Sequence, residues 1–133
     1  MQYEDKRALS SVRLDHAFEC LSAAEGLIDI GNYRSAVNRS YYAVFHAMRA
    51  VLAFDEIDMK HHSGIISEFR RLYIKTGVFE NKLSVIISIL FDVRTDSDYD
   101  DFFIISKDEV LEQLSNARYF LDSIKRYLDS KHD

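Results

Sequence analysis

The sequence contains no proline, no tryptophan, four glycines and one cysteine among its 133 residues. A soluble protein of this length would average about six or seven prolines. This scarcity of turn-forming residues excludes an all-β fold and favours long, uninterrupted helices. The single cysteine, Cys20, excludes an intrachain disulfide framework and a cysteine-rich zinc site. It falls in an apolar stripe, where we expect a packed core thiol in a reducing compartment such as the cytoplasm.

Basic residues are fewer than acidic ones, with 17 Lys plus Arg against 22 Asp plus Glu, a net charge of −5. This balance argues against a protein that binds nucleic acid by bulk electrostatics, but it permits a locally basic groove. The first residues show no basic region followed by an apolar one, and no run approaches about 18 uncharged apolar residues. We therefore expect no export signal, no membrane span and a cytoplasmic location.

Apolar residues recur every three or four positions through most of the chain, which is typical of amphipathic helices. Glycines and polar clusters divide the chain into five such segments, without a repeat or a domain linker. We therefore predict one all-α domain over residues 1–133, an up-and-down bundle of about five helices. The predicted helical segments are 6–30, 33–54, 63–77, 82–94 and a last segment that follows Ser106.

The fourth segment, 82–94, is ambiguous because its continuous β-branched run also fits a buried strand. No second strand-like run could supply its ladder hydrogen bonds, so we predict a buried helix. Local signals mark the ends of two other helices. Ser63 is expected to cap the third helix and Gly77 to end it. Ser106 and Glu109 have the spacing of a capping box at the start of the fifth.

The aspartate-rich segment 92–101, expected to follow the fourth helix, matches a calcium-binding loop in its alternate acids. Asp101, however, stands where such a loop needs glycine, and Lys107 where it needs a bidentate glutamate, which excludes an EF-hand. The adjacent His61 and His62 would diverge on a helix and make a poor metal pair. We therefore predict no metal site and no cofactor.

A second ridge on the helix over 33–54 consists of Arg34, Asn38, Tyr42 and His46, spaced four apart on one face. It is either a solvated or dimer-facing side of the helix or the wall of a cleft. In a cleft, His46 would titrate near neutral pH and Asn38 would hold a phosphate or a base edge. Arg94 lies among five aspartates and must pair with them or point into the same kind of cleft.

Two stretches carry a resemblance to a known family: Arg34-Ser-Ala-Val-Asn-Arg-Ser-Tyr-Tyr-Ala-Val-Phe-His-Ala-Met48 and, about fifty residues later, Arg94-Thr-Asp-Ser-Asp-Tyr99. The sequence resembles the HEPN family of prokaryotic helical domains over nearly its entire length. The resemblance implies a bundle of about five helices and a homodimer. Many members are linked to metal-independent RNA cleavage in a cleft shared by two copies. Others are toxin and antitoxin partners of a minimal nucleotidyltransferase.

The motif of the nuclease members is an arginine followed four to six residues later by a histidine. Arg94 matches the arginine, whereas Tyr99 takes the place of the histidine. A phenol with an ordinary pKa near 10 is a poor base at neutral pH, so Tyr99 weakens the nuclease interpretation. The resemblance also implies that Tyr99 could accept a nucleotide from the nucleotidyltransferase. The predicted catalytic residues are Arg94, Tyr99 and His46, and the predicted nucleotide- or RNA-binding residues are Arg34, Asn38, Tyr42 and Asp96.

Two functions follow as hypotheses. The first is a dimeric, toxin-like protein of a nucleotidyltransferase pair, acting as a metal-independent endoribonuclease. The alternative is a non-catalytic HEPN module that binds a nucleotide, an RNA or the partner nucleotidyltransferase.

Overall fold

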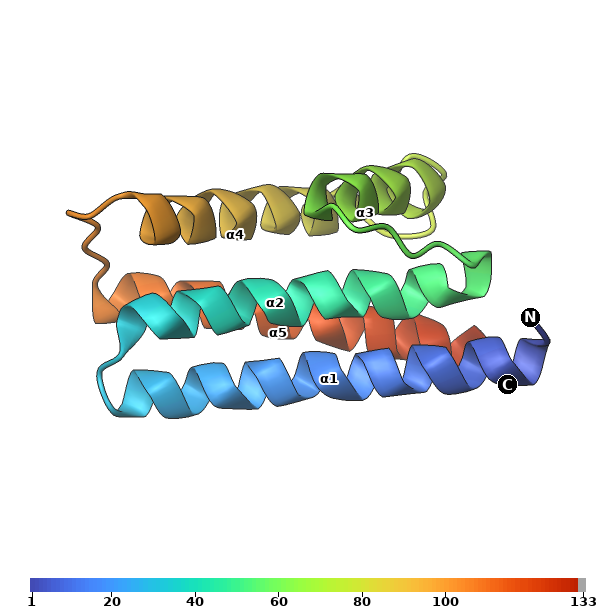
Figure 1. Cartoon of the computed structure of the whole chain (residues 1–133), viewed down its shortest axis with the longest axis horizontal. Helices are drawn as coiled ribbons and strands as arrows, with labels where there is room; N and C mark the ends of the chain where they lie inside the picture. The colour runs from blue at the N-terminus through green and yellow to red at the C-terminus, as the bar shows by residue number, and fades with distance from the viewer. Residues whose placement is uncertain (132–133) are drawn as a thin grey trace.

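Four long helices run alternately up and down along one axis in the computed structural model, which describes residues 1–131 (Figure 1). A shorter helix, α3, continues into a π-helical segment, η2, and the described residues contain no strand. The all-α prediction is therefore confirmed, and the ambiguous fourth segment is a helix. The elements are α1 (Tyr3–Asp29), α2 (Tyr33–Leu52), η1 (Ala53–Asp55), α3 (His62–Phe69), η2 (Arg70–Ile74), α4 (Asn81–Tyr99) and α5 (Lys107–Lys131).

Several helix ends lie where local chemistry places them. Gly31 and Gly77 have φ of 78° and 81°, the left-handed conformation that glycine adopts without steric cost, and they follow α1 and η2. The backbone N–H of Glu109 donates to Ser106 Oγ at 3.1 Å, which confirms the predicted serine cap of α5.

Two predicted boundaries are wrong. Ser63 does not cap α3, because the helix begins at His62 and its N-cap is His61, two residues earlier. The His62 ring is hydrogen-bonded to Tyr41 of α2, a tertiary contact that favours helix at this residue and that the local sequence does not reveal. The aspartate-rich segment does not follow the fourth helix, because α4 continues through it to Tyr99. Arg94 and Asp98 form an ion pair at i, i+4 on this extension, which favours the helical conformation there.

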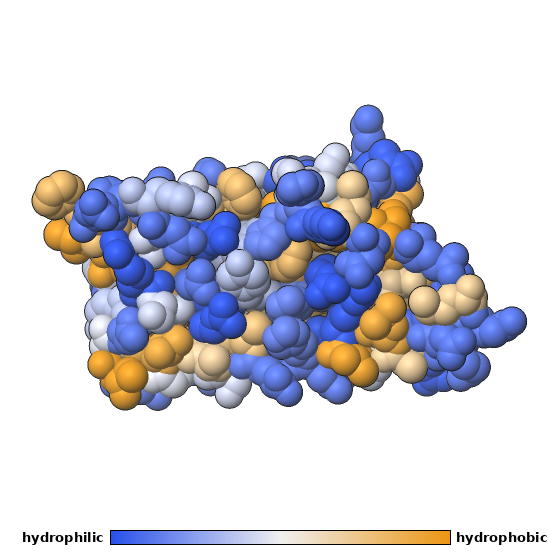
Figure 2. All heavy atoms as spheres, in the orientation of Figure 1, coloured by the Kyte–Doolittle hydropathy of each residue, from blue (hydrophilic) through white to orange (hydrophobic). Residues whose placement is uncertain are grey.

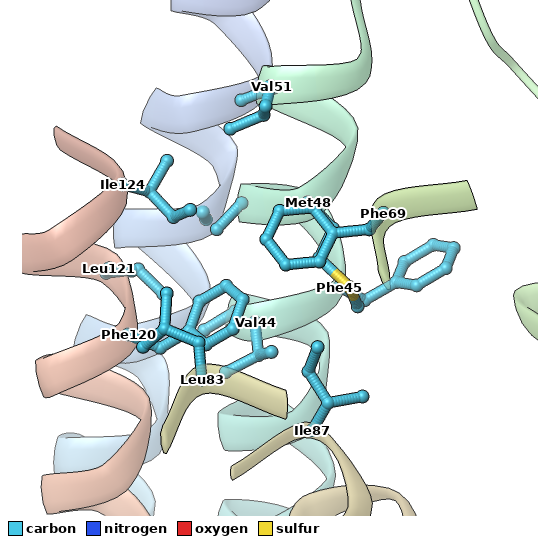
Figure 3. Close-up of a cluster of buried hydrophobic side chains, with 14 of the residues drawn as sticks. Val44, Phe45, Met48, Val51, Phe69, Leu83, Ile87, Phe120, Leu121 and Ile124 are labelled. Atoms are coloured by element: carbon cyan, nitrogen blue, oxygen red, sulfur yellow. The ribbon is translucent and has the colours of Figure 1, made fainter. Parts of the chain in front are cut away.

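The core forms around α2, whose residues are buried on nearly all sides. Figure 3 shows side chains of α2, α3, α4 and α5 converging on one cluster. Burying each large apolar side chain stabilises the fold by about 1.5–3 kcal/mol. The predicted core thiol, Cys20, belongs to the same core and is 4% exposed. The labelled members of the cluster are Val44, Phe45, Met48, Val51, Phe69, Leu83, Ile87, Phe120, Leu121 and Ile124.

The two ends of the bundle differ. The start of α1 and the end of α5 lie at one pole, and the α1–α2 turn and the α4–α5 loop lie at the other (Figure 1). Apolar side chains gather at the loop pole in Figure 2, where Phe102 and Ile104 are 89% and 90% exposed. Among the helices that the structure describes, none has the length and apolar run needed to cross a membrane.

Candidate functional site

Arg94 on α4 reaches across to two tyrosines of α2. Its guanidinium carbon lies 5.0 Å from the ring centroid of Tyr41 and 5.6 Å from that of Tyr42. Its Nη2 donates a hydrogen bond to the Tyr42 hydroxyl at 3.2 Å, and its Nε lies 3.0 Å from Asp98 Oδ2. The side chain is 18% exposed. The sequence left open whether Arg94 pairs with an aspartate or faces the ridge on α2, and it does both.

A shallow pocket of about 380 Å³ adjoins this cluster and is lined by Arg34, Asn38 and Arg39 of α2 and by Asp98 of α4. Arg39 donates from Nη2 and Nε to Asn38 Oδ1, at 2.8 and 3.3 Å, and lies over the Tyr42 ring. Asp98 therefore both pairs with Arg94 and forms part of the pocket wall. Guanidinium groups and an amide in this arrangement suit a phosphate group, provided that it displaces the carboxylate of Asp98 from Arg94.

Arg34 anchors the start of α2 to the loop pole. Its Nη2 donates to the backbone oxygen of Asp100 at 2.8 Å, and its guanidinium lies 5.7 Å from the ring centroid of Phe103. Arg34 and Asn38 line the pocket and Tyr42 binds Arg94, so the structure brings these four predicted residues together.

His46, the last residue of the predicted ridge, lies one helical turn from Tyr42, with ring centroids 6.0 Å apart. Burial is the largest cause that lowers its pKa, followed by the charges of His16, Arg49 and Arg39, and the pKa falls to about 4. The expectation that His46 titrates near neutral pH is therefore wrong. The imidazole is neutral at pH 7 but a weak base, because its site disfavours the protonated form.

Two predicted residues lie apart from the Arg94 cluster. Tyr99 is the last residue of α4 and is 80% exposed. Asp96 is exposed as well. Two residues correspond to about 200° around a helix, so Asp96 points away from the face that carries Arg94.

Sequence reasoning missed three residues that belong to the site, namely Tyr41, Arg39 and His62. The Tyr41 hydroxyl and His62 Nδ1 are hydrogen-bonded at 3.0 Å. Burial raises the pKa of Tyr41 to about 12 and lowers that of His62, which the positive charge of Arg94 lowers further. His62 was considered only as half of a metal pair. No signal in the sequence separates it from its neighbour; only the structure does, because His61 is exposed and His62 is partly buried.

A second polar cluster lies between α1 and α2. Arg13 donates to the backbone oxygen of Arg49 at 3.1 Å, and both arginines pair with Asp58, at 3.4 and 3.3 Å. One turn further along α1, the His16 ring stacks on His46 with centroids 4.0 Å apart.

Cys20 lies beside this stacked histidine pair. One donor atom from each of His16, Cys20 and His46 lies within 4.8 Å of the other two. Burial raises the pKa of the Cys20 thiol, and the Arg39 guanidinium opposes that effect by favouring the thiolate.

Comparison with known proteins gives the family. The HEPN domain family matches residues 10–127. The chain is 34% identical over 132 residues to "Putative toxin MJ0142" of Methanocaldococcus jannaschii, which covers 99% of this chain and 89% of that protein. It is 32% identical over 113 residues to a "UPF0332 protein" of Thermotoga maritima, with 85% and 86% covered. "Putative toxin MJ0605" of M. jannaschii is 32% identical over 125 residues, with 94% and 92% covered. The chain belongs to the HEPN domain family.

Proposed function

We propose that this chain is a toxin-like HEPN protein that acts on cytoplasmic RNA as a metal-independent endoribonuclease. The observation that carries the proposal is the position of Arg94, held by Tyr42 beside the pocket that Arg34, Asn38 and Arg39 line. Family membership and the toxin names of two relatives support it. The protein has a net charge of −5, so RNA contacts must be local, and this pocket supplies them.

The chemistry needs a base, a charge-stabilising group and no metal. The base removes the proton of a ribose 2′-hydroxyl, and the 2′-oxygen attacks the adjacent phosphorus. The bond from phosphorus to the 5′-oxygen breaks, and that oxygen takes up a proton from water, leaving a 2′,3′-cyclic phosphate. Arg94 would stabilise the negative charge that develops on the phosphate oxygens. His62 is better placed than His46 to act as the base. Its ring is hydrogen-bonded to the Tyr41 hydroxyl, and the Tyr41 ring packs against the Arg94 guanidinium, so His62 lies close to Arg94.

The proposal includes a homodimer with a cleft shared by two copies. Within one chain, Tyr42 and His46 are already half-buried against neighbouring helices, so the α2 ridge does not by itself require a second copy. The exposed apolar side chains at the loop pole, Phe102 and Ile104, are better candidates for the dimer contact. Sedimentation equilibrium checks this directly, and a monomer at micromolar concentration would remove the shared cleft.

Tyr99 has a separate role in the proposal. Its exposed phenol is accessible to a nucleotidyltransferase partner, which would transfer a nucleoside monophosphate from a nucleoside triphosphate and release pyrophosphate. The HEPN resemblance suggests this modification, and the placement of Tyr99 outside the Arg94 cluster agrees with it. Incubation with the neighbouring nucleotidyltransferase, if the genome encodes one, and mass spectrometry of Tyr99→Phe against the unchanged protein test the assignment.

The experiment that tests the activity is cleavage of total cellular RNA by the purified protein in EDTA. We expect cleavage by the unchanged protein, its loss in Arg94→Ala and in His62→Ala, and no change in Tyr99→Phe. Arg118→Ala is the matched control, because Arg118 is an exposed arginine on α5 that pairs with Glu25. Absence of cleavage by any form contradicts the nuclease, and equal loss in Arg118→Ala would show that the assay reports charge or folding instead.

A second candidate function is a non-catalytic module that binds a nucleotide or RNA. The ion pair of Arg94 with Asp98 favours it, because it neutralises the motif arginine within the chain. Fluorescence anisotropy with a labelled oligoribonucleotide tests it: we expect binding that weakens in Arg34→Ala and Arg39→Ala, without any cleavage. Binding that is equally weak in all forms would contradict this function too.

A further inference from the structure

We propose that His16, Cys20 and His46 bind one zinc ion between α1 and α2, with a fourth coordination position open to solvent. This inference does not depend on the proposed action on RNA. Its basis is the meeting of two imidazoles and one thiol from two packed helices, with one donor atom of each within 4.8 Å of the other two.

Helix geometry builds the site. His16 and Cys20 are four residues apart on α1, so their side chains lie on one face of that helix, which packs against α2. His46 comes from the facing side of α2, and its ring stacks on that of His16 at an angle of 21°. Zinc–nitrogen and zinc–sulfur bonds of about 2.0–2.3 Å place tetrahedral ligand atoms roughly 3.3–3.8 Å apart. Side-chain rotations that separate the two stacked rings and shorten the distances between the donor atoms by about 1 Å would give this geometry.

The donor set selects the metal. A thiolate with two imidazoles suits zinc and is a poor set for magnesium or calcium, which prefer oxygen ligands. Cys20 is buried, His46 is half-buried and His16 is exposed, so the site opens to solvent on the His16 side. Three protein ligands with one open position is the arrangement of zinc sites that bind water or an exogenous ligand.

The charges around the cluster restrict which metal ions it can bind. Arg49 Nη1 lies 3.5 Å from His46 Nδ1, and Arg39 lies near Cys20, so two cations oppose a divalent ion. Loss of the thiol proton supplies one negative charge at the metal, and Asp58 partly neutralises Arg49. Weakly coordinating cations do not overcome this repulsion, which makes the site selective for metals that bind thiolate strongly.

The test uses the untagged, reduced, metal-free protein, titrated with Co²⁺ as a spectroscopic probe and then with Zn²⁺. We expect one equivalent of Co²⁺ to give a thiolate charge-transfer band in the near ultraviolet, and one equivalent of Zn²⁺ to remove it. Zinc should also raise the melting temperature, because it links α1 to α2, whereas Mg²⁺ should not. Failure to see a saturable thiolate band would overturn the proposal, and so would a stabilisation that Mg²⁺ reproduces.

Variants separate the site from adventitious binding. Cys20→Ser should abolish the charge-transfer band, but this residue is buried, so His16→Ala provides an exposed substitution that spares the core. Removing a residue that only hydrogen-bonds to a metal ligand lowers metal affinity by about 10–100-fold. His16 is a direct ligand in this proposal, so His16→Ala should weaken zinc binding by at least about tenfold. His61→Ala is the matched control, because His61 is an exposed histidine outside the cluster. Equal weakening in His61→Ala, or none in His16→Ala, would contradict the site.

Discussion

The Tyr42 hydroxyl accepts a hydrogen bond from Arg94 at 3.2 Å, although the two residues are 52 positions apart in the sequence. The contact joins α2 to α4 and fixes the guanidinium beside the pocket that the α2 ridge lines. Because Arg94 also pairs with Asp98 on its own helix, the arginine is held from both sides. Its position is therefore set before any ligand binds.

Tyr42→Phe should reduce RNA cleavage or binding while keeping the fold. The substitution removes the hydrogen bond but retains the ring that packs against the guanidinium. We expect a loss of about 0.5–1.5 kcal/mol in the free energy of unfolding, the usual net value of one hydrogen bond. Urea unfolding and the RNA assay measure the two effects. Tyr99→Phe, at an exposed position, is the control, and an equal effect in both variants would refute the positioning role of Tyr42.

Phe120→Ala should destabilise the protein by about 3–5 kcal/mol, the range for removing a fully buried aromatic side chain and leaving a cavity. Phe120 of α5 packs against Phe69 of α3 with ring centroids 5.8 Å apart. Val12→Ala truncates an apolar side chain of α1 that is 65% exposed, and should alter stability by less than about 0.5 kcal/mol. Thermal and urea unfolding of both variants test the pair. A small effect of Phe120→Ala would contradict the core described above.

Ser106→Ala should lower the free energy of unfolding by about 1 kcal/mol, because it removes the oxygen that accepts the Glu109 N–H at the start of α5. Ser130→Ala, near the other end of α5, is a suitable comparison because its exposed hydroxyl donates to a backbone oxygen that lies within the helix. Circular dichroism during urea unfolding measures both. Equal stability of the two variants would show that the cap contributes nothing.

Acid should destabilise the protein through His46. Its pKa is about 4 in the folded protein against 6.5 when unperturbed, so the unfolded chain binds more protons between these values. The stabilising contribution is complete above pH 6.5 and is lost as the pH falls toward 4. Between pH 7 and pH 5 we expect roughly 1–2 kcal/mol of the loss in unfolding free energy to come from this residue.

His46→Gln should show a smaller decline with acid than the unchanged protein, since glutamine does not titrate. The measurement is urea unfolding at both pH values in EDTA, so that metal binding does not contribute. His61→Gln, at an exposed position, should follow the unchanged protein. If His46→Gln declines as steeply as the others, burial of neutral His46 is not the cause.

The sequence is sufficient to predict the helices, since their apolar periodicity, their glycine stops and the Ser106 cap are local signals. The start of α3 was not predictable in this way, because His62 is hydrogen-bonded to Tyr41 of another helix. The end of α4 carried a local signal, the i, i+4 pairing of Arg94 with Asp98, which the apolar periodicity does not include. Local periodicity does not encode contacts between helices.

The candidate site likewise contains residues that the sequence could predict and residues that it could not. Spacing of four on one helix identified Arg34, Asn38 and Tyr42, which the structure does bring together around one pocket and Arg94. His62 could not be found by spacing, because it reaches the site from a different helix. The proximity of Cys20 to His46 could not be predicted from spacing either, because it results from the packing of α1 on α2.

The start of α1 and the end of α5 lie at the pole opposite the exposed Phe102 loop. That separation is about 40 Å, the length of the 27-residue α1 at 1.5 Å per residue. A protein captured on a sensor surface through a tag at either terminus would therefore present the loop pole, with its apolar side chains, to the solution. Immobilisation by this route leaves free the surface that we propose as the dimer contact, whereas random coupling through lysines would mask part of it.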